Sequence, residues 1–294
     1  MKKNLIVILI TFNNEKVIKK CLDSMFKQTF NDFTLLIIDN DSTDGTIKTI
    51  KSYFLSRSEL KNKTELLKNN QNIGFAKAVN IGFKKALWKK DYYKAVLLIN
   101  SDTYFNKNLF KNGIEALFLK KDIGACSPTI FYPDGKIWWI ASRHLSTKEI
   151  VFDLNYGISK RIKQELDNPI SKNVFESSLL TGCALFIKTE AIRKIGLFNE
   201  SYFMYVEDVD YCLRLKKYNY KLCRFTKGKI YHARYTDTKN LFLEIRRDII
   251  STISTGKYIF KSYPLYIFVA WLIKLPLVIL LKTIKKTPLT RIFS

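Results

Sequence analysis

The sequence feature that most constrains the fold is an uninterrupted apolar run that ends in polar, oxygen-bearing side chains. Val96-Leu97-Leu98-Ile99 is followed directly by Asn100-Ser101-Asp102. A run that is apolar at every residue and too short for a helix is typical of a strand buried on both faces of a parallel sheet. Open α/β sheets bind ligands outside the carboxyl ends of their strands. We therefore expect a cleft after Ile99, with the side chains of Asn100 and Asp102 on the same side.

The two side chains that end this run also indicate what the cleft holds. Asn100 and Asp102 offer hard oxygen ligands of the kind that Mg²⁺ or Mn²⁺ prefers, and such an ion can carry a diphosphate. A turn that simply favours Asn, Ser and Asp explains the same residues without any ligand. Both interpretations stay open on this motif alone.

Repeated strand and helix patterns with short connections fill the first half of the chain. Strands are expected at residues 5–10, 34–38, 65–68, 96–99 and 123–126, with helical patterns between them. This repetition predicts a mostly parallel, doubly wound α/β sheet with helices on both faces. The glycine-rich fingerprints of dinucleotide-binding and P-loop proteins are absent from the sequence. The chain therefore lacks the phosphate-binding loop on which both of those functions depend.

Polar residues follow the other expected strands as well. Asp39 closes the second strand, where an ionised carboxylate can accept hydrogen bonds from ribose hydroxyls or a base N–H. After the third strand, Gly74 allows a close backbone approach, and the N-terminus of the next helix offers free N–H groups to an anion. For Asn80 and Gly82 within that helix, tight packing and substrate contact both stay open.

The second half of the chain loses this regular repetition. Residues 128–139 contain two β-prone runs around a Pro-Asp-Gly turn, which predicts a hairpin that bears Trp138 and Trp139. These tryptophans either line a sugar platform or are simply buried. The polar sequence that continues to about residue 173 is typical of a substrate lid or a disordered loop.

Three carboxylates and a histidine stand out towards the end of this half. Glu207, Asp208 and Asp210 lie at the start of an expected helix, after an apolar lead-in. Capping requires only one carboxylate, and a desolvated one at this place is suited to general base catalysis. His232 ends a short strand, and a lone histidine is more often structural than ligating.

Seven short motifs, taken together and in this order, carry a resemblance to a known family. They are Thr11-Phe12-Asn13, Asp39-Asn40-x-Ser42-x-Asp44, Asn72-x-Gly74-Phe75-Ala76, Asn100-Ser101-Asp102, Thr181-Gly182-x-Ala184, Gly196-x-Phe198-Asn199-Glu200 and Glu207-Asp208-x-Asp210-x-x-x-Arg214. Residues 5–232 thereby resemble the family 2 glycosyltransferases of GT-A fold, most closely the rhamnosyltransferase-like branch of bacterial polysaccharide synthesis. Asn100 is a departure, because the family's metal motif often has Asp there.

The resemblance implies an inverting, metal-dependent transfer of rhamnose or another hexose from a nucleotide diphosphate sugar to a hydroxyl of a saccharide or lipid-linked saccharide. Asp208 would be the base that removes the acceptor proton, and Asp102 and His232 would hold the divalent metal, Mn²⁺ or Mg²⁺. The residues implied to face the acceptor or to support the base are Glu207, Asp210, Trp138 and Trp139. The implied nucleotide- and donor-binding residues are Thr11, Asn13, Asp39, Asn72, Gly74, Lys77, Asn100 and Ser101.

Residues 236–294 form a basic, helical C-terminal extension to the domain of residues 1–235. From Tyr211 to Ser294 the sequence has 18 Lys or Arg against 3 Asp or Glu, in a chain of formal net charge +24. Residues 263–281 are nearly all apolar, but Lys274 and Pro276 interrupt them, and a central lysine costs about 3 kcal/mol on insertion scales. We expect this segment to lie on the anionic inner face of the cell membrane. The alternative is a helix of the core, or a helix that joins two copies of the chain in a homo-oligomer.

Two other functions compete with sugar transfer. The positive charge fits a nucleic-acid-binding protein, but none of the known binding motifs is present in the sequence, and we expect no nucleic-acid partner. A catalytically silent nucleotide-sugar-binding domain fits the amide at Asn100. The five cysteines show no metal-ligand or disulfide spacing, which favours the reducing cytoplasm.

Overall fold

The uninterrupted apolar runs become the central strands of one large sheet. In β4 (Tyr93–Asn100), residues 95–99 expose none of their surface, and β1 (Lys3–Thr11) and β2 (Phe33–Asp39) are almost as deeply buried. Strands that are apolar on both faces fit between two layers of helix, as the sequence predicts. The structure, a computed structural model, describes residues 3–88, 92–139, 141–152, 159–162, 168–233 and 241–286.

The sheet is mixed. Its strand order is β10-β11-β13-β6-β12-β4-β1-β2-β3, with β5 beside β13 and β7 beside β6. β4, β1, β2 and β3 run parallel, which confirms the doubly wound half, but β12 runs antiparallel to both β4 and β6. The other strands of this sheet are β3 (Thr64–Lys68), β5 (Thr103–Phe105), β6 (Ile123–Phe131), β7 (Ile137–Trp139), β10 (Pro169–Ser171), β11 (Val174–Glu176), β12 (Ala184–Lys188) and β13 (Lys221–His232).

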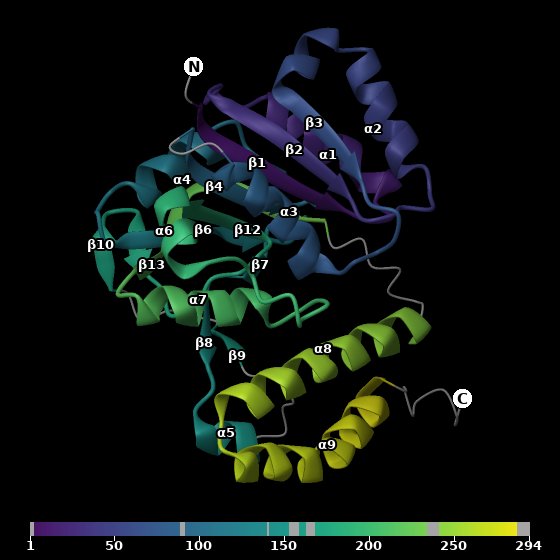
Figure 1. The fold of residues 1–294 in the computed structure, drawn as a ribbon, viewed down its shortest axis with the longest axis vertical. Coiled ribbons are helices and arrows are strands. Elements are labelled where there is room, and N and C mark those ends of the chain that lie inside the picture. Colours follow the sequence, from purple (N-terminus) through teal and green to yellow (C-terminus); the bar gives the residue numbers. More distant parts are fainter. Residues whose placement is uncertain are drawn as a thin grey trace.

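Helices cover both faces of the sheet (Figure 1). α3, α6 and α7 pack on one face, and α1 and α4 lie on the other, with α2 beside α1. Gly82 lets α3 approach β1, because a Cβ there would lie 2.6 Å from the Ile8 side chain; packing therefore explains this glycine. The helices of the body are α1 (Glu15–Phe26), α2 (Thr46–Leu55), α3 (Phe75–Leu87), α4 (Leu109–Leu117), α6 (Thr189–Ile195) and α7 (Glu207–Lys217), and a short 3-10 helix spans Ser58–Lys63.

Several expected elements differ in detail. The strand that ends at His232 is longer than expected, because β13 spans 12 residues, with an irregular register between Phe225 and Ile230. The helix with the three carboxylates begins at Glu207. The N-cap residues Asn14 of α1 and Lys188 of α6 make no side-chain capping hydrogen bond. The predicted hairpin is confirmed, because β6 and β7 pair antiparallel.

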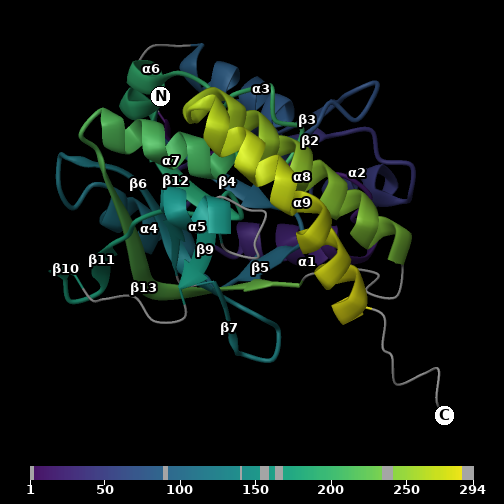
Figure 2. The ribbon, with the colours of Figure 1, turned by 90° about the horizontal axis from the view of Figure 1, so that it is seen from below.

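The polar segment after this hairpin, of which residues 141–152 and 159–162 are described, is called the insertion below. It forms a second, two-stranded sheet from β8 (Ala141–His144) and β9 (Ser159–Ile162), and a short helix, α5 (Thr147–Phe152), lies between them. The C-terminal extension consists of α8 (Leu241–Ser262) and α9 (Leu265–Lys286), which cross the lower side of the molecule (Figure 2). The expected boundary between residues 235 and 236 lies outside the described residues.

None of the described helices combines the length and the apolar content that crossing a bilayer requires. α9 nevertheless packs against α5 and α8, so the extension and the insertion form one layer. This layer lies on the side of the molecule where α7 begins (Figure 1).

Candidate active site

The carboxyl ends of three adjacent strands form the edge at which the sequence places a ligand. In the parallel register, Thr11 of β1 is level with Asp39 of β2, and Ile10 is level with Asn100 of β4. Side chains that follow these strands therefore gather along one edge of the sheet. The structure thus brings together three of the sequence-predicted positions: Thr11, Asp39 and Asn100.

Asparagine side chains fasten the loops of this edge to one another. The Asn14 Oδ1 atom accepts a hydrogen bond from the Ser101 hydroxyl at 2.7 Å and from the Phe12 N–H at 3.1 Å. The Asn13 Oδ1 atom accepts from the Thr43 N–H at 2.8 Å. Both side chains thus connect the loop after β1 to its neighbours.

A second asparagine network holds the loop before α3. Asn40 donates to the Asn72 Oδ1 atom at 2.8 Å and accepts from the Ile73 N–H at 3.1 Å. Asn72 also accepts from the Gly74 N–H. Gly74 has φ +85°, and a Cβ there would lie 2.5 Å from the Phe203 carbonyl oxygen. The close backbone approach expected at Gly74 is therefore made to the loop that contains Phe203.

Asp39, which lies among these hydrogen-bonded asparagines, has one carboxylate oxygen without a hydrogen-bond donor in the described structure. The carboxylate is fully buried, and its Oδ2 atom accepts from the Ser42 N–H at 2.9 Å. Its Oδ1 atom has no hydrogen-bond partner among the described residues. A buried carboxylate oxygen without a partner is costly, so a donor from a ligand would satisfy it. A ribose hydroxyl or a base N–H has the required chemistry.

Asp102 and His232 meet beside the end of β4. The His232 Nε2 atom lies 3.5 Å from the Asp102 Oδ2 atom, and the Ala233 N–H donates to the Asp102 carbonyl at 2.8 Å. Trp138 stacks on the imidazole, with ring centroids 4.6 Å apart and planes 2° from parallel. Burial raises the pKa of the Asp102 carboxyl, and the charge of His232 opposes this rise.

This pair fits a divalent metal that is completed by its ligand. No cluster of three or more His, Cys, Asp or Glu that could enclose an ion is found in the described residues. A carboxylate oxygen and an imidazole nitrogen at contact distance suit Mn²⁺, and Mg²⁺ commonly keeps waters and phosphate oxygens among its ligands. Asp102 and His232 would therefore supply the protein's share of the coordination, with diphosphate oxygens and water as the remainder.

Asp208 is held at the start of α7 by backbone donors. Its Oδ2 atom accepts from the Gly182 N–H at 2.9 Å, and its Oδ1 atom accepts from the Val209 N–H at 2.8 Å. The next residue, Cys183, accepts from the Asn100 N–H at 3.0 Å. Two hydrogen bonds thus tie Asp208 to the end of β4, because the antiparallel β12 begins where β4 ends.

The surroundings of α7 raise the proton affinity of its first two carboxyls. Burial raises the pKa of Asp208, while the Gly182 and Val209 N–H groups lower it. Burial, and then the charge of Asp208, raise the pKa of Glu207 well above its usual range. The Glu207 Oε2 atom is buried without a hydrogen-bond partner in the described structure. Asp208, which keeps two backbone donors, is the better placed of the two to carry the negative charge.

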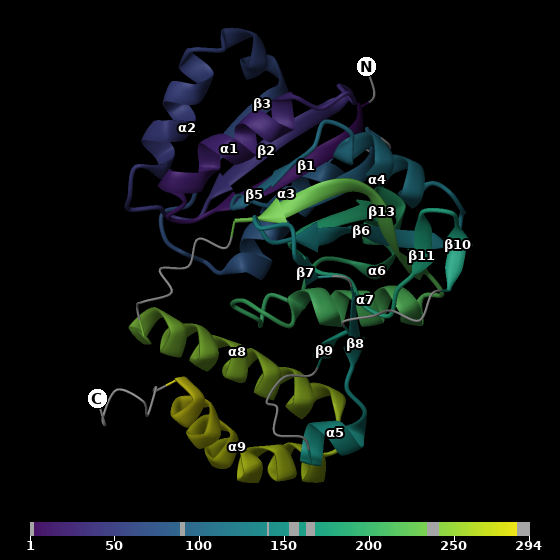
Figure 3. The ribbon, with the colours of Figure 1, turned by 180° about the vertical axis from the view of Figure 1, so that it is seen from behind.

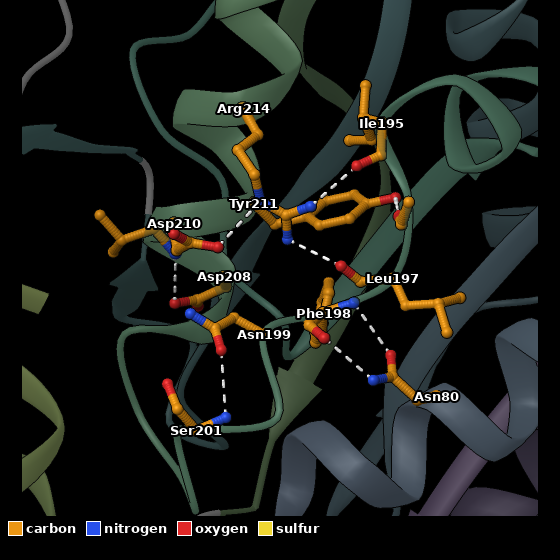
Figure 4. A network of polar contacts seen from close by, with 12 residues as sticks. Asn80, Ile195, Leu197, Phe198, Asn199, Ser201, Asp208, Asp210, Tyr211 and Arg214 are labelled. Atoms are coloured by element: carbon orange, nitrogen blue, oxygen red, sulfur yellow. Dashed lines mark hydrogen bonds and ion pairs between the residues drawn. The ribbon is translucent and has the colours of Figure 1, made fainter. Parts of the chain in front are cut away.

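Asp210 and Asn80 hold the loop before α7 (Figure 4). Asp210 pairs with Arg214 at 2.9 Å, and Arg214 donates to the Ile195 and Leu197 carbonyls. Asn80, which is fully buried, bonds both the N–H and the carbonyl of Phe198. Packing, rather than substrate contact, therefore explains Asn80. Asp210 is likewise occupied by a structural ion pair.

The model for glycosyl transferase family 2 matches residues 6–186 of the chain. The chain belongs to glycosyl transferase family 2.

Relatives and solved structures agree with this family. N-acetylglucosaminyl-diphospho-decaprenol L-rhamnosyltransferase of Mycobacterium tuberculosis is 25% identical over 248 residues, which cover 79% of this chain and 76% of the relative. A dolichyl N-acetyl-alpha-D-glucosaminyl phosphate 3-beta-D-2,3-diacetamido-2,3-dideoxy-beta-D-glucuronosyltransferase of Methanococcus voltae is 24% identical over 270 residues, or 85% of this chain and 71% of the relative. The structure of a Pyrobaculum calidifontis mannosyltransferase with GDP-Man and Mn²⁺ superimposes with TM-score 0.56 and 16% identity, covering 96% of this chain and 79% of that one.

This glycosyltransferase has the GT-A fold, a mostly parallel sheet between helices. Membership of the family favours sugar transfer over nucleic-acid binding as the function of this basic chain. The structure also shows the surroundings of two other predicted site residues. Lys77 is exposed on the first turn of α3, and the Trp139 ring is buried, with its Nε1 atom donating to Ser142 in the insertion.

Sequence reasoning missed three residues that build this site. Asn14, Asn40 and Gly182 connect its loops, yet their partners Ser101, Asn72 and Asp208 stand 87, 32 and 26 positions away. No local pattern reports such contacts. Asn40 and Gly182 are both part of the motifs that carry the family resemblance, which is the one signal that marked them.

Proposed function

We propose that this glycosyltransferase moves a hexose, rhamnose or a related sugar, from a nucleotide diphosphate sugar to a hydroxyl of a lipid-linked saccharide, with inversion at the anomeric carbon. The observation that carries the proposal is the position of Asp208. It is a carboxylate of raised pKa, held by two backbone N–H groups and tied through Gly182 and Cys183 to the end of β4.

Inversion requires a base on the face of the sugar opposite the leaving group. Asp208 would accept the proton of the acceptor hydroxyl as that oxygen attacks the anomeric carbon and the nucleoside diphosphate departs. Its raised pKa makes it a stronger base than an exposed aspartate. Asp208 would be the charged member of the pair, because it keeps two backbone N–H donors, whereas the Glu207 Oε2 atom has no hydrogen-bond partner among the described residues.

The donor would occupy the edge between β2 and β4. The Oδ1 atom of Asp39 is suited to a hydroxyl or N–H of the nucleoside, since it is buried and has no partner among the described residues. Asp102 and His232 would hold Mn²⁺ or Mg²⁺ against the diphosphate. The ion would neutralise charge that develops on the leaving group. Trp138, stacked on His232, would keep the imidazole plane fixed.

The proposed acceptor follows from the names of two relatives, which both describe sugars on polyprenyl carriers. Such an acceptor is anchored in a bilayer. We therefore also propose that the enzyme works at the cytoplasmic face of the membrane, as the basic C-terminal extension indicates.

A donor screen tests the proposed function. Purified full-length enzyme would be incubated with a panel of nucleotide diphosphate sugars, with Mn²⁺ or with chelator, and with a polyprenyl diphosphate N-acetylglucosamine acceptor. We expect one donor to be consumed with Mn²⁺ present, and NMR of the product to show an anomeric configuration opposite to that of the donor. Retention of configuration, or turnover unaffected by chelator, would contradict the mechanism.

A further inference from the structure

One face of α9 is apolar and uncovered. Its opposite face packs inward through Ile267, Trp271 and Val278, which are buried. The side chains that point outward recur at helical spacing and are each between 43% and 75% exposed: Leu265, Tyr266, Val269, Leu272, Ile273, Leu277, Ile279 and Leu280. We call these eight residues the outward face of α9. A contiguous exposed apolar surface of this kind marks an interaction site.

The outward face of α9 carries no charge, although its helix contains a lysine near the middle. Lys274 turns towards α5, where its Nζ atom donates to the Ile150 carbonyl. Basic residues stand instead at the two ends of the apolar stretch. Lys257 and Lys261 precede it in α8, and the sequence places Lys282, Lys285 and Lys286 at the end of α9.

α8 and α5, which pack against α9, also expose apolar side chains. α8 and α9 pack closely at Gly256, where a Cβ would lie 3.2 Å from the Trp271 ring. Earlier in α8, Ile245, Ile249 and Ile253 form an exposed stripe at four-residue spacing, and Phe152 at the end of α5 is 80% exposed. α9 is the layer farthest from the sheet (Figures 1 and 3), so no element among the described residues of the body covers its outward face.

The same helices are bonded to the loop that leads into the catalytic carboxylate. The Ser254 hydroxyl donates to the Met204 carbonyl at 2.8 Å, and the Lys257 Nζ atom donates to the Ser201 carbonyl at 3.0 Å. Two residues after Met204 comes Val206, a β-branched residue at φ +74°, and then Glu207 and Asp208. A left-handed valine is strained and persists only where its surroundings hold it. α8 is one of the elements that hold this loop.

We propose that the outward face of α9 docks on an anionic lipid bilayer and thereby brings the loop before Asp208 close to the membrane. The docking rests on the apolar face and its basic ends, whereas its purpose rests on the proposed lipid-linked acceptor. An anionic bilayer receives the apolar side chains and neutralises the lysines at both ends. A second copy of the chain would instead bring two basic extensions together, and their like charges would repel.

Vesicle co-sedimentation of the full-length enzyme tests this docking. The variant carries Ile273→Glu and Leu277→Glu on the outward face of α9, and the matched control carries Leu55→Glu and Trp88→Glu, two exposed apolar positions on α2 and after α3. We expect wild type and control to bind vesicles of phosphatidylcholine with phosphatidylglycerol within about twofold of each other, and the α9 variant to bind at least about tenfold more weakly. Vesicles of phosphatidylcholine alone should bind the wild type more weakly than anionic ones.

Two results would overturn the docking. One is a wild-type enzyme that stays in the supernatant with anionic vesicles. The other is a dimer in light scattering without vesicles that the α9 variant, but not the control, converts to a monomer, because the face would then join two copies. Turnover with a soluble, short-chain acceptor should be equal in all three proteins. Its absence from all three would contradict the proposed function and leave the docking intact.

Discussion

Two neighbouring regions of the active-site edge use their polar side chains in opposite ways. In the loops after β1 and β2, asparagines bond other loops: Asn13 to Thr43, Asn14 to Ser101 and Asn40 to Asn72. Around the ends of β4 and β13 and the start of α7, carboxylates meet a histidine or backbone N–H groups and have raised pKa values. The polar side chains of the first region hold the loops in place. Those of the second region include carboxylates of raised proton affinity.

Asp39 lies in the first region but resembles the residues of the second. It lies among the asparagines, but it uses one oxygen for the Ser42 N–H and leaves the other without a partner in the described residues. Within one family motif, Asn40 thus bonds a neighbouring loop, whereas Asp39 has a buried oxygen to which a ligand could donate. Substitutions of the first kind of residue should act through stability, and those of the second kind through activity.

The largest effect is expected at Asp208. Asp208→Asn preserves size but removes the basic oxygen, so transfer should fall by about 10²–10⁴-fold while donor binding stays near that of wild type. Product formation under saturating donor and nucleotide binding by calorimetry would measure the two effects. If Asp208→Asn still transfers sugar while Glu207→Gln does not, the base is Glu207.

Asp102→Ala should have the next largest effect. Asp102 is a proposed ligand of an ion that would stabilise the charge on the leaving group by several kcal/mol. Without this ligand, transfer should fall by about a hundredfold or more. Mn²⁺ binding can be followed separately by quenching of tryptophan fluorescence, since Trp138 stacks on His232. Circular dichroism should show an intact fold. Transfer by Asp102→Ala in excess chelator at the rate of untreated wild type would contradict the metal hypothesis.

Asn80→Ala tests a residue that holds a loop, and it should affect stability rather than transfer. The change leaves the buried N–H and carbonyl of Phe198 without their partner, and should lower the free energy of unfolding by roughly 2–4 kcal/mol. Urea unfolding measures this, with Asn62→Ala on the exposed 3-10 helix as the control. Transfer per folded molecule should change little. A hundredfold loss of transfer at unchanged stability would place Asn80 among the ligand-binding residues.

The smallest effect is a shift in pH dependence. A base must be unprotonated, and burial raises the pKa of Asp208; transfer should therefore decline on acidification at a pH above the ordinary aspartate pKa of about 3.9. The rate should fall about tenfold per pH unit below the raised pKa. Profiles of kcat/KM would show this acid limb. A rate that stays level down to about pH 4 would mean that burial does not perturb the group that limits transfer.

The sequence predicts the parallel half of the fold because each strand there is a dense apolar run with a polar end. β1, β2 and β4, and the positions of Asp39, Asn100 and Asp102 at their ends, follow from that pattern alone. The direction of β12 does not, because all five residues from Ala184 to Lys188 are buried and give no sign of which way the strand runs.

The C-terminal extension shows a different limit. Lys274 interrupts an apolar stretch in the sequence, yet in the structure it bonds α5 and leaves the outward face of α9 uncharged. That outcome depends on the insertion, which lies 124 positions earlier and has no local pattern that predicts its contacts. Likewise, the contact of His232 with Trp138 depends on a hairpin far away in the sequence.

The hydrogen bond from the Gly182 N–H to Asp208 should make this amide a reporter of the protonation state of Asp208. This amide belongs to the turn before an antiparallel strand, and its acceptor is the oxygen of the proposed base. When that carboxylate takes up a proton, the bond weakens, because a charged acceptor binds an N–H more strongly than a neutral one. The nuclear magnetic resonance frequency of a single backbone amide would thus follow the charge of Asp208 in the resting enzyme, with neither donor nor acceptor added.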